Sequence, residues 1–143
     1  PGTVLAGAVV VVLVGVAVTA WPPAVSPDGG WRAARDDAHS VEVAAAGEPY
    51  VLVGLPELKS LDALRFPLRQ LGADPPGPAA LASQGGPRLL IIVCDPVLEP
   101  IIGAACGGAA ESAWLAVHGL VAQPSGTVTP TGPRRVTSTW RVP

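Results

Sequence analysis

The sequence predicts an α+β domain that follows one N-terminal transmembrane helix. No charged side chain occurs in residues 1–27, and residues 4–20 are almost wholly apolar. Farther along, short runs alternate polar and apolar residues, and leucines recur at spacings of three and four residues between them. Strand-like runs with a helix between them predict a small, mostly antiparallel sheet with one or two short helices.

The composition limits the folded part to one small domain, which we place at residues 40–143. Only 14% of the residues are charged, against roughly 25% in typical soluble domains. Much of the apolar fraction is alanine and valine, and aromatic residues make up only 4%. We therefore expect a thin core and marginal stability without a partner or a covalent link. No basic cluster exceeds two residues and the net charge is −2, so no nucleic-acid partner is expected.

Residues 1–21 form the predicted transmembrane anchor. The uncharged run at residues 3–21 has 19 residues, close to the roughly 20 that cross a hydrocarbon core of about 30 Å. Trp21 stands where an interfacial aromatic residue is expected, and Pro22 and Pro23 then stop the helix. The alternatives are a cleaved signal peptide, whose apolar region is usually shorter, and a buried segment of a soluble core. We expect the lipid bilayer to surround this helix.

Two glycines mark a candidate helix-packing face within the anchor. Gly7 and Gly15 are eight residues apart and fall on nearly one side of a helix. Small residues let helices approach closely in membranes, although this spacing is not the strict GxxxG pattern. Chance composition is the competing interpretation.

Residues 22–39 are rich in proline and glycine and predict an irregular linker between the anchor and the domain. Arg32 and Arg35 follow the span and, taken alone, favour a cytoplasmic domain under the positive-inside rule. The cysteine pair and a tail rich in threonine, proline and glycine favour the opposite side. We expect the domain on the exoplasmic side, which means the periplasm or the cell exterior.

The first half of the domain predicts a hairpin and one helix. The Ser-Val-Glu-Val-Ala run at residues 40–44 alternates polar and apolar residues, and residues 50–54 continue in the same style after a turn. The leucines that follow recur at helical spacing, and Pro56 suits the first turn of a helix. Pro67 should end or kink that helix, so we predict it at residues 56–66.

The second half of the domain predicts three more strands. Residues 88–94 form a short apolar run with β-branched residues, typical of a central strand, and residues 97–113 have a loosely helical pattern. Residues 114–122 resemble another strand, and residues 135–142 alternate well enough to close the sheet as an antiparallel strand. A second membrane span over residues 89–122 is an alternative that acidic residues and prolines disfavour.

The only two cysteines, Cys94 and Cys106, predict a disulfide. In a small domain that faces an oxidising compartment, an even pair typically serves as a covalent link. The closed loop would have about a dozen residues, for which chain entropy gives roughly 3 kcal/mol. Two buried free thiols are the alternative, and the surrounding sequence resembles neither a CxxC redox motif nor a zinc site.

The remaining polar residues have simple structural interpretations. Asp36, Asp37 and His39 resemble a metal-ligating set, but they lie in the predicted linker, where side chains are poorly fixed. His118 would need an orienting carboxylate to act as a general base. The acids that the nearby sequence offers are Asp95, Glu99 and Glu111. The sequence has no nucleophile elbow, P-loop or dinucleotide motif, so we predict no catalytic residues, no metal site and no cofactor.

Four residues are candidate partner contacts: Trp31, Trp140, Arg134 and Arg135. Trp31 follows the predicted span closely enough to touch the membrane surface or to dock on the domain. Arg134 and Arg135, together with Trp140, form a small basic and aromatic tail that suits a partner or lipid headgroups. Simple solvation is the competing interpretation of the arginines.

These features predict a noncatalytic, single-pass, membrane-anchored accessory or structural subunit of a larger membrane protein complex. Other integral-membrane subunits are the expected partners, and binding them would stabilise a domain with a thin core. The alternative is a membrane-tethered binding module of the cell envelope for a polysaccharide, peptide or lipid. A small anchored enzyme that uses His118 is the least favoured hypothesis.

Overall fold

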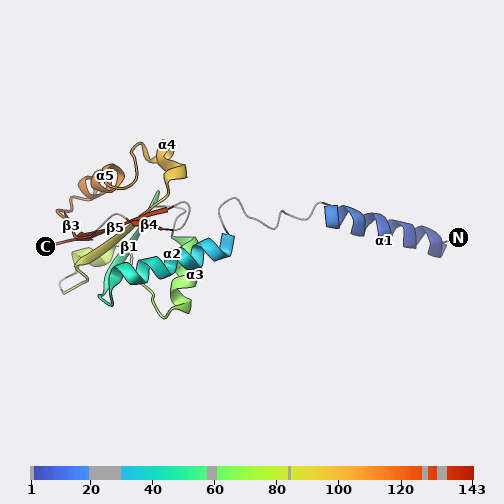
Figure 1. The fold of residues 1–143 in the computed structure, drawn as a ribbon, viewed down its shortest axis with the longest axis horizontal. Helices are drawn as coiled ribbons and strands as arrows, with labels where there is room; N and C mark the ends of the chain where they lie inside the picture. The colour runs from blue at the N-terminus through green and yellow to red at the C-terminus, as the bar shows by residue number, and fades with distance from the viewer. Residues whose placement is uncertain (1, 20–29, 58–60, 84, 127–128, 132–134) are drawn as a thin grey trace.

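The computed structural model describes residues 2–19, 30–57, 61–83, 85–126, 129–131 and 135–143. It contains an N-terminal helix and a domain in which several helices cover a mixed β-sheet (Figure 1). The predicted α+β class is therefore confirmed. The structure differs from the prediction in one parallel strand pair and in two helices that replace predicted strands.

Helix α1, Gly2–Thr19, covers most of the segment predicted as a membrane anchor. Its described side chains are exposed, from 52% at Val9 to 72% at Val11. Among the described residues, no helix is both long enough and apolar enough to cross a membrane. The transmembrane anchor therefore stays a prediction.

Helix α2, Gly30–Ala45, opens the domain and corrects the first predicted strand. Residues 40–44 are helical, so the predicted hairpin with residues 50–54 does not form. Apolar residues on α2 recur at spacings of three and four and face the core, which is the pattern of an amphipathic helix. This buried stripe consists of Ala34, Ala38, Val41 and Ala45. The helix also occupies the last part of the predicted linker.

Three strands form the centre of the sheet: β1 (Tyr50–Leu55), β2 (Leu89–Cys94) and β5 (Arg135–Arg141). These confirm the strands expected in the three regions. However, β1 and β2 are parallel, with Tyr50 opposite Leu89, whereas β2 and β5 are antiparallel. The sheet is therefore mixed, and three of its four described strand pairings are antiparallel, so the β1–β2 pair is the exception to the mostly antiparallel prediction. Parallel strands need a crossover connection, and between β1 and β2 the chain passes through α3 and returns in the same direction.

Two short strands complete the sheet beside β5. They are β3 (Gln123–Pro124) and β4 (Thr129–Thr131), and both pair with β5 in antiparallel orientation. The strand order is β1-β2-β5-β3, with β4 as a further partner of β5. The long strand β5 therefore links the parallel pair to the rest of the sheet.

Helix α3, Asp62–Gln70, begins later than the predicted helix at residues 56–66 and continues beyond Pro67. Pro56 and Glu57 directly follow β1 and are not helical, and residues 58–60 of the predicted helix lie outside the described residues. Leu64 and Leu68 lie one turn apart and are fully buried. The leucine spacing correctly predicted a helix, whereas its two ends were displaced by several residues.

Short helical segments make up the remaining connections. They are η1 (Pro78–Ala82), η2 (Pro96–Leu98), α4 (Glu99–Ile102) and α5 (Ala109–Val117). The strand predicted at residues 114–122 is wrong, because its first residues form the end of α5. Trp114 and Leu115 are buried there, and so short an apolar run does not distinguish a strand from a helix.

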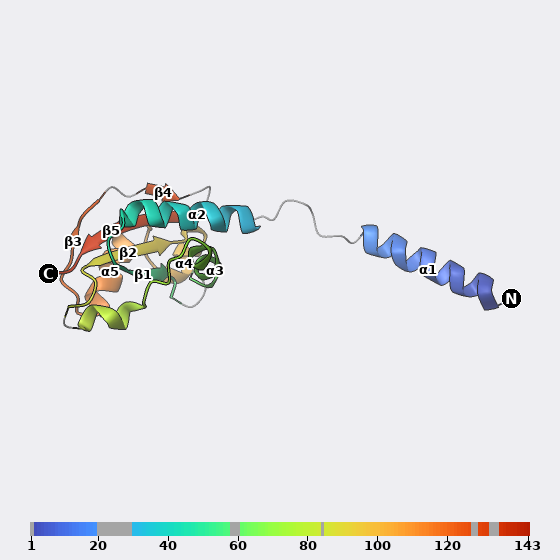
Figure 2. The same cartoon turned by 90° about the horizontal axis from the view of Figure 1, so that it is seen from below.

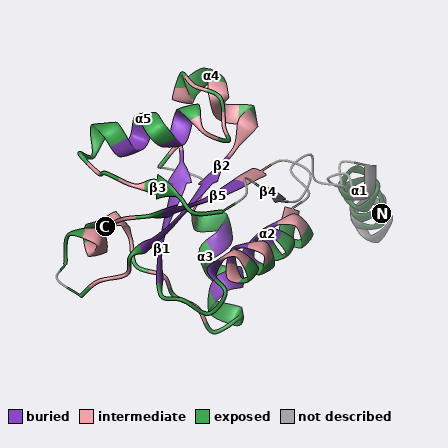
Figure 3. Ribbon diagram, turned by 60° about the vertical axis from the view of Figure 1, so that its left-hand side comes forward, coloured by how far each residue is buried: buried purple, intermediate pink, exposed green. Residues whose placement is uncertain are grey.

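The sheet separates two hydrophobic clusters. Helices α2 and α3 cover one face and α4 and α5 lie on the other (Figure 3), and α2 runs alongside the strands (Figure 2). On the first face the buried side chains include Tyr50, Leu52, Leu64, Leu68 and Ile91. On the second face they include Leu90, Ile92, Trp114, Leu115 and Trp140. Alternate residues of β1 and β2 therefore serve opposite faces, as strand geometry requires.

Candidate functional site

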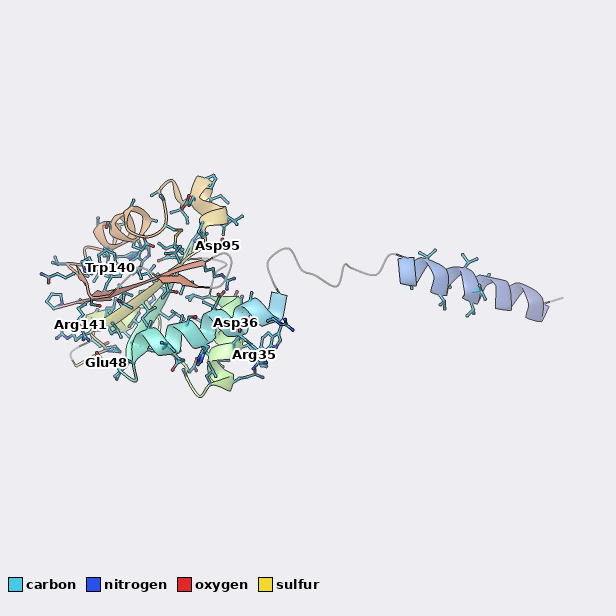
Figure 4. All side chains as sticks on the ribbon, in the orientation of Figure 1. Arg35, Asp36, Glu48, Asp95, Trp140 and Arg141 are labelled. Carbon is cyan, nitrogen blue, oxygen red and sulfur yellow. A yellow bond between two sulfur atoms is a disulfide. The ribbon has the colours of Figure 1, made fainter. Side chains whose placement is uncertain are left out.

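Several chain segments converge at the edge of the sheet where β1 and β2 end. Parallel strands share a carboxyl edge, which in α/β sheets is the usual place for a binding site. Asp95 follows β2 at this edge, and Arg35 and Asp36 lie toward the start of α2 (Figure 4). The opposite edge of the domain carries Glu48, Trp140 and Arg141 (Figure 4).

An aromatic pair forms one wall of a pocket near the start of α2. The ring centroids of Trp31 and Phe66 lie 5.5 Å apart and their planes are tilted by 51°, a favourable geometry for an aromatic contact. Trp31 is nevertheless 48% exposed and Phe66 58% exposed. The pocket has a volume of about 270 Å³. Its lining is completed by Gly30, Ala34, Asp62, Ala63 and Arg135.

Arg135 also forms a largely buried ion pair with Asp37. Its Nη1 donates to Asp37 Oδ2 at 2.6 Å, and this contact joins β5 to α2. Burial raises the pKa of the Asp37 carboxyl, and the charge and hydrogen bond of Arg135 offset part of that rise. Asp37 Oδ1 has no hydrogen-bond partner among the described residues. Arg135, expected at a partner interface, is therefore used inside the domain.

A second hollow, of about 380 Å³, lies between the outer sides of α2 and α3. It is lined by Arg35, Asp36, His39, Pro67, Gln70 and Leu71. Asp36 and His39 share this hollow, but Asp37 points to Arg135 instead, because consecutive helical residues point in different directions. In the part of the chain that the structure describes, no group of three or more His, Cys, Asp or Glu side chains is placed to hold a metal.

The structure brings His118 to a carboxylate that the sequence analysis did not consider. His118 Nε2 lies 3.3 Å from Glu57 Oε1, which also accepts a hydrogen bond from Trp114 Nε1 at 2.5 Å. The rings of Trp114 and His118 lie 4.2 Å apart. Glu57 follows β1 and His118 caps α5, so the two residues are far apart in the sequence. This cluster ties the end of β1 to α5.

The three acids that the sequence offered as partners of His118 accept hydrogen bonds from backbone N–H groups instead. Asp95 Oδ1 accepts from the Val97 N–H at the start of η2. Glu99 Oε1 accepts from the Cys106 N–H at 2.8 Å. Glu111 is fully buried and its carboxylate accepts from the two backbone N–H groups that precede α5. These acids therefore cap helices and order loops.

Cys94 and Cys106 are paired in a disulfide, with their Cα atoms 5.6 Å apart. The bond ties the last residue of β2 to the loop before α5. The Glu99 contact to Cys106 lies within the same loop. Residues 94–111 are therefore fixed by a covalent link and two buried or half-buried carboxylates.

The other predicted contact residues lie in different surroundings. Trp140 is only 7% exposed, and its Nε1 donates to Ser138 Oγ at 3.0 Å, so its ring belongs to the core. Arg134 lies outside the described residues. On α1, a Cβ added at Gly7 or Gly15 would meet no atom within 4 Å.

No family model, curated protein or solved structure matches this chain. The site must therefore be interpreted from its own geometry. Most charged side chains in the described core serve pairing or capping, whereas the start of α2 and α3 exposes aromatic rings beside arginines. That arrangement suits contact with another surface.

Proposed function

We propose that this chain is a noncatalytic, single-pass, membrane-anchored accessory or structural subunit of a larger membrane protein complex. The observation that carries the proposal is the apolar surface of α1. The six consecutive residues from Val9 to Val14 are all at least 52% exposed. Successive residues turn by about 100° around a helix, so these six expose apolar surface on every side. Such a surface is normally covered by lipid or by another protein.

The length of the apolar segment agrees with this proposal once the sequence beyond α1 is included. The 18 residues of α1 give about 27 Å at 1.5 Å per residue, slightly less than a hydrocarbon core of about 30 Å. The uncharged sequence continues to Trp21. The proposed span is therefore residues 3–21.

We place the domain on the exoplasmic side. The Cys94–Cys106 disulfide supports this side, because disulfides persist in the periplasm and outside the cell and are rare in the cytosol. The bond also supplies the covalent link that a domain with so few aromatic residues needs.

The accessory role is supported by a second exposed apolar region, in and next to α4 and α5. It consists of Val97, Ile101, Val117 and Val121, whose exposed fractions range from 63% to 83%. Aliphatic side chains gathered on one side of a domain suit the hydrophobic centre of a protein interface. This region is our candidate contact for another subunit.

The alternative function, a tethered binding module, has weaker support. Recognition of a polysaccharide needs aromatic rings on an exposed face, yet Trp114 and Trp140 are 8% and 7% exposed. Trp31 and Phe66 remain as the exposed aromatic pair of the domain's described part. A single pair in a pocket of about 270 Å³ leaves room only for a small ligand group.

The test is to capture the partner of the full chain. A C-terminal tag, extraction in mild detergent and mass spectrometry should recover integral-membrane proteins in stoichiometric amount. Ile101→Glu should reduce that recovery, whereas Val43→Glu, at a similarly exposed aliphatic residue on α2, should not. A lone chain, stable and monodisperse after extraction, would overturn the accessory-subunit proposal.

A further inference from the structure

We infer that the start of α2 and the adjoining part of α3 rest on the membrane surface. We call this region the aromatic edge and define it by Trp31, Phe66, Arg32, Arg35 and Arg65. The inference rests on the proposed membrane anchor and adds the surface through which the domain meets the bilayer. It assigns a lipid contact to Trp31, for which the sequence left two interpretations open, the membrane surface and the domain.

Chain length restricts where the aromatic edge can lie. Eleven peptide steps separate Thr19, the last residue of α1, from Gly30, the first residue of α2. At no more than about 3.6 Å per residue, the start of α2 lies within about 40 Å of the end of α1. Trp31 is the next residue, so it is held near the bilayer wherever α1 is embedded. The exposed apolar residues around α4 are connected to α1 only through the folded domain.

The aromatic pair has the chemistry of a membrane interface. A tryptophan ring combines an apolar body with one N–H donor, and such rings gather at the level of lipid headgroups. Trp31 is held against Phe66 with a centroid distance of 5.5 Å, so the pair is already ordered before it meets a surface. Both rings keep about half of their area exposed. Membrane contact would cover that area.

The charges around the pair suit phosphate groups. Arg32, Arg35 and Arg65 are exposed, and none of them forms an ion pair within the described residues. Asp36 and Asp62 are exposed on the same helices and leave a small positive excess. Arginine donors bind phosphate oxygens in a fixed planar geometry, so we expect anionic lipid to strengthen the contact.

The experiment uses the full chain in vesicles of phosphatidylcholine with brominated acyl chains, with and without phosphatidylglycerol. In a Trp21→Phe background, Trp31 is the exposed fluorophore, and Trp114 and Trp140 are buried. The brominated lipid should quench a distinct part of the emission. Most of that quenching should be lost when Trp31→Phe is added, while the emission of the two buried rings stays unchanged and reports the intact fold.

Anionic lipid provides the second readout. Phosphatidylglycerol should increase the quenching of Trp31, and Arg32→Gln with Arg65→Gln should remove the increase. Arg88→Gln is the matched control, because Arg88 precedes β2 at the opposite edge, where its guanidinium donates to the Pro143 carbonyl.

Vesicle flotation separates the two proposals. If the chain floats with the vesicles and Trp31→Phe changes the quenching as stated, the lipid contact is supported. If the chain floats but brominated lipid quenches the Trp21→Phe chain equally with and without Trp31→Phe, the lipid contact is overturned while the anchor stands. A protein then becomes the candidate occupant of the aromatic edge. If the chain does not float, the anchor and the lipid contact both fail.

Discussion

Helices α1 and α2 have similar lengths, but α2 packs on the domain, whereas the described side chains of α1 are exposed. α1 has 18 residues and α2 has 16. In α2 the apolar residues form one stripe, and Ala38 and Val41 are completely buried against the sheet. In α1 apolar residues surround the helix, and every described large side chain from Val9 to Val16 is more than half exposed.

The difference shows which helix finds its partner within the chain. A helix with one apolar stripe needs one surface to cover it, and for α2 the sheet and α3 provide that surface. A helix that is apolar on all sides needs a surrounding medium or several neighbours. The described part of the chain does not cover α1, and this is why we propose a membrane for it.

Replacing a valine by aspartate in each helix gives the sharpest contrast, and the loss of unfolding free energy should be larger in α2. Val41→Asp places a charge where the side chain is 0% exposed. An unpaired buried charge costs far more than the lost methyl groups, so we expect the domain to lose more than about 3 kcal/mol of unfolding free energy. Denaturant unfolding of the full chain in detergent, followed by tryptophan emission, measures this loss. A stability within error of the parent would contradict the assignment of α2 to the core.

The disulfide tests how the other face of the sheet is held. α5 is short, and the loop before it depends on the Cys94–Cys106 bond across a sequence separation of 12 residues. Replacing both cysteines by serine should lower the unfolding free energy by about 3 kcal/mol, because the unfolded chain regains the entropy of an open loop. The parent protein measured with reductant is the control and should unfold at the same denaturant concentration as the variant.

The Asp37–Arg135 pair tests the attachment of α2 to β5. Burial raises the pKa of Asp37 above its ordinary value of about 4, so the folded protein holds this proton more tightly than the unfolded chain. The contribution of Asp37 to stability is therefore greatest below about pH 4 and declines as the pH rises through the folded pKa. Asp37→Asn should remove this decline. The unfolding free energy of Asp37→Asn, compared with that of the parent, should therefore shift in favour of the variant as the pH rises through the folded pKa of Asp37.

Measurements of unfolding free energy at a series of pH values check the Asp37 prediction. The difference between the parent and Asp37→Asn should change with pH in the acidic range and become constant above the folded pKa. A difference that is constant throughout, from about pH 3 upward, would show that Asp37 titrates alike in the folded and unfolded chains.

The smallest expected effect on the domain is that of Val11→Asp in α1. Val11 is 72% exposed and contributes no contact to either hydrophobic cluster. The unfolding free energy of the domain should therefore stay within about 0.5 kcal/mol of the parent, as for other surface substitutions. A large loss of stability would mean that α1 packs on the domain and would remove the contrast with α2.

The parts of the fold that the sequence predicted are those with unambiguous periodicity. β2 is a continuous run of apolar and β-branched residues, and β5 alternates, so both were correctly located. Residues 40–44 also alternate, but Val41 and Ala45 belong to a stripe that begins at Ala34, and only the longer window reveals the helix. The parallel pairing of β1 and β2 depends on the crossover through α3, which no local pattern specifies.

Site residues were predictable from the sequence where residue type alone identified the partner, and not where the contact joins distant segments. The two cysteines could be paired because the chain has no others. Glu57 and His118 lie 3.3 Å apart but 61 positions apart in sequence, so their contact required the fold. Trp140 was expected at a partner contact because it lies near arginines in the C-terminal tail, but residues 137–140 of β5 are all buried, since helices cover both faces.

Membrane retention of the full chain tests the central claim most directly. Membranes from cells that express the parent chain or Val11→Asp would be extracted with alkaline carbonate, and the pellet and supernatant compared. Because a carboxylate at the centre of a membrane helix costs about 3 kcal/mol, we predict that the parent stays in the pellet and that Val11→Asp shifts toward the supernatant. Complete release of the parent chain would contradict the membrane anchor.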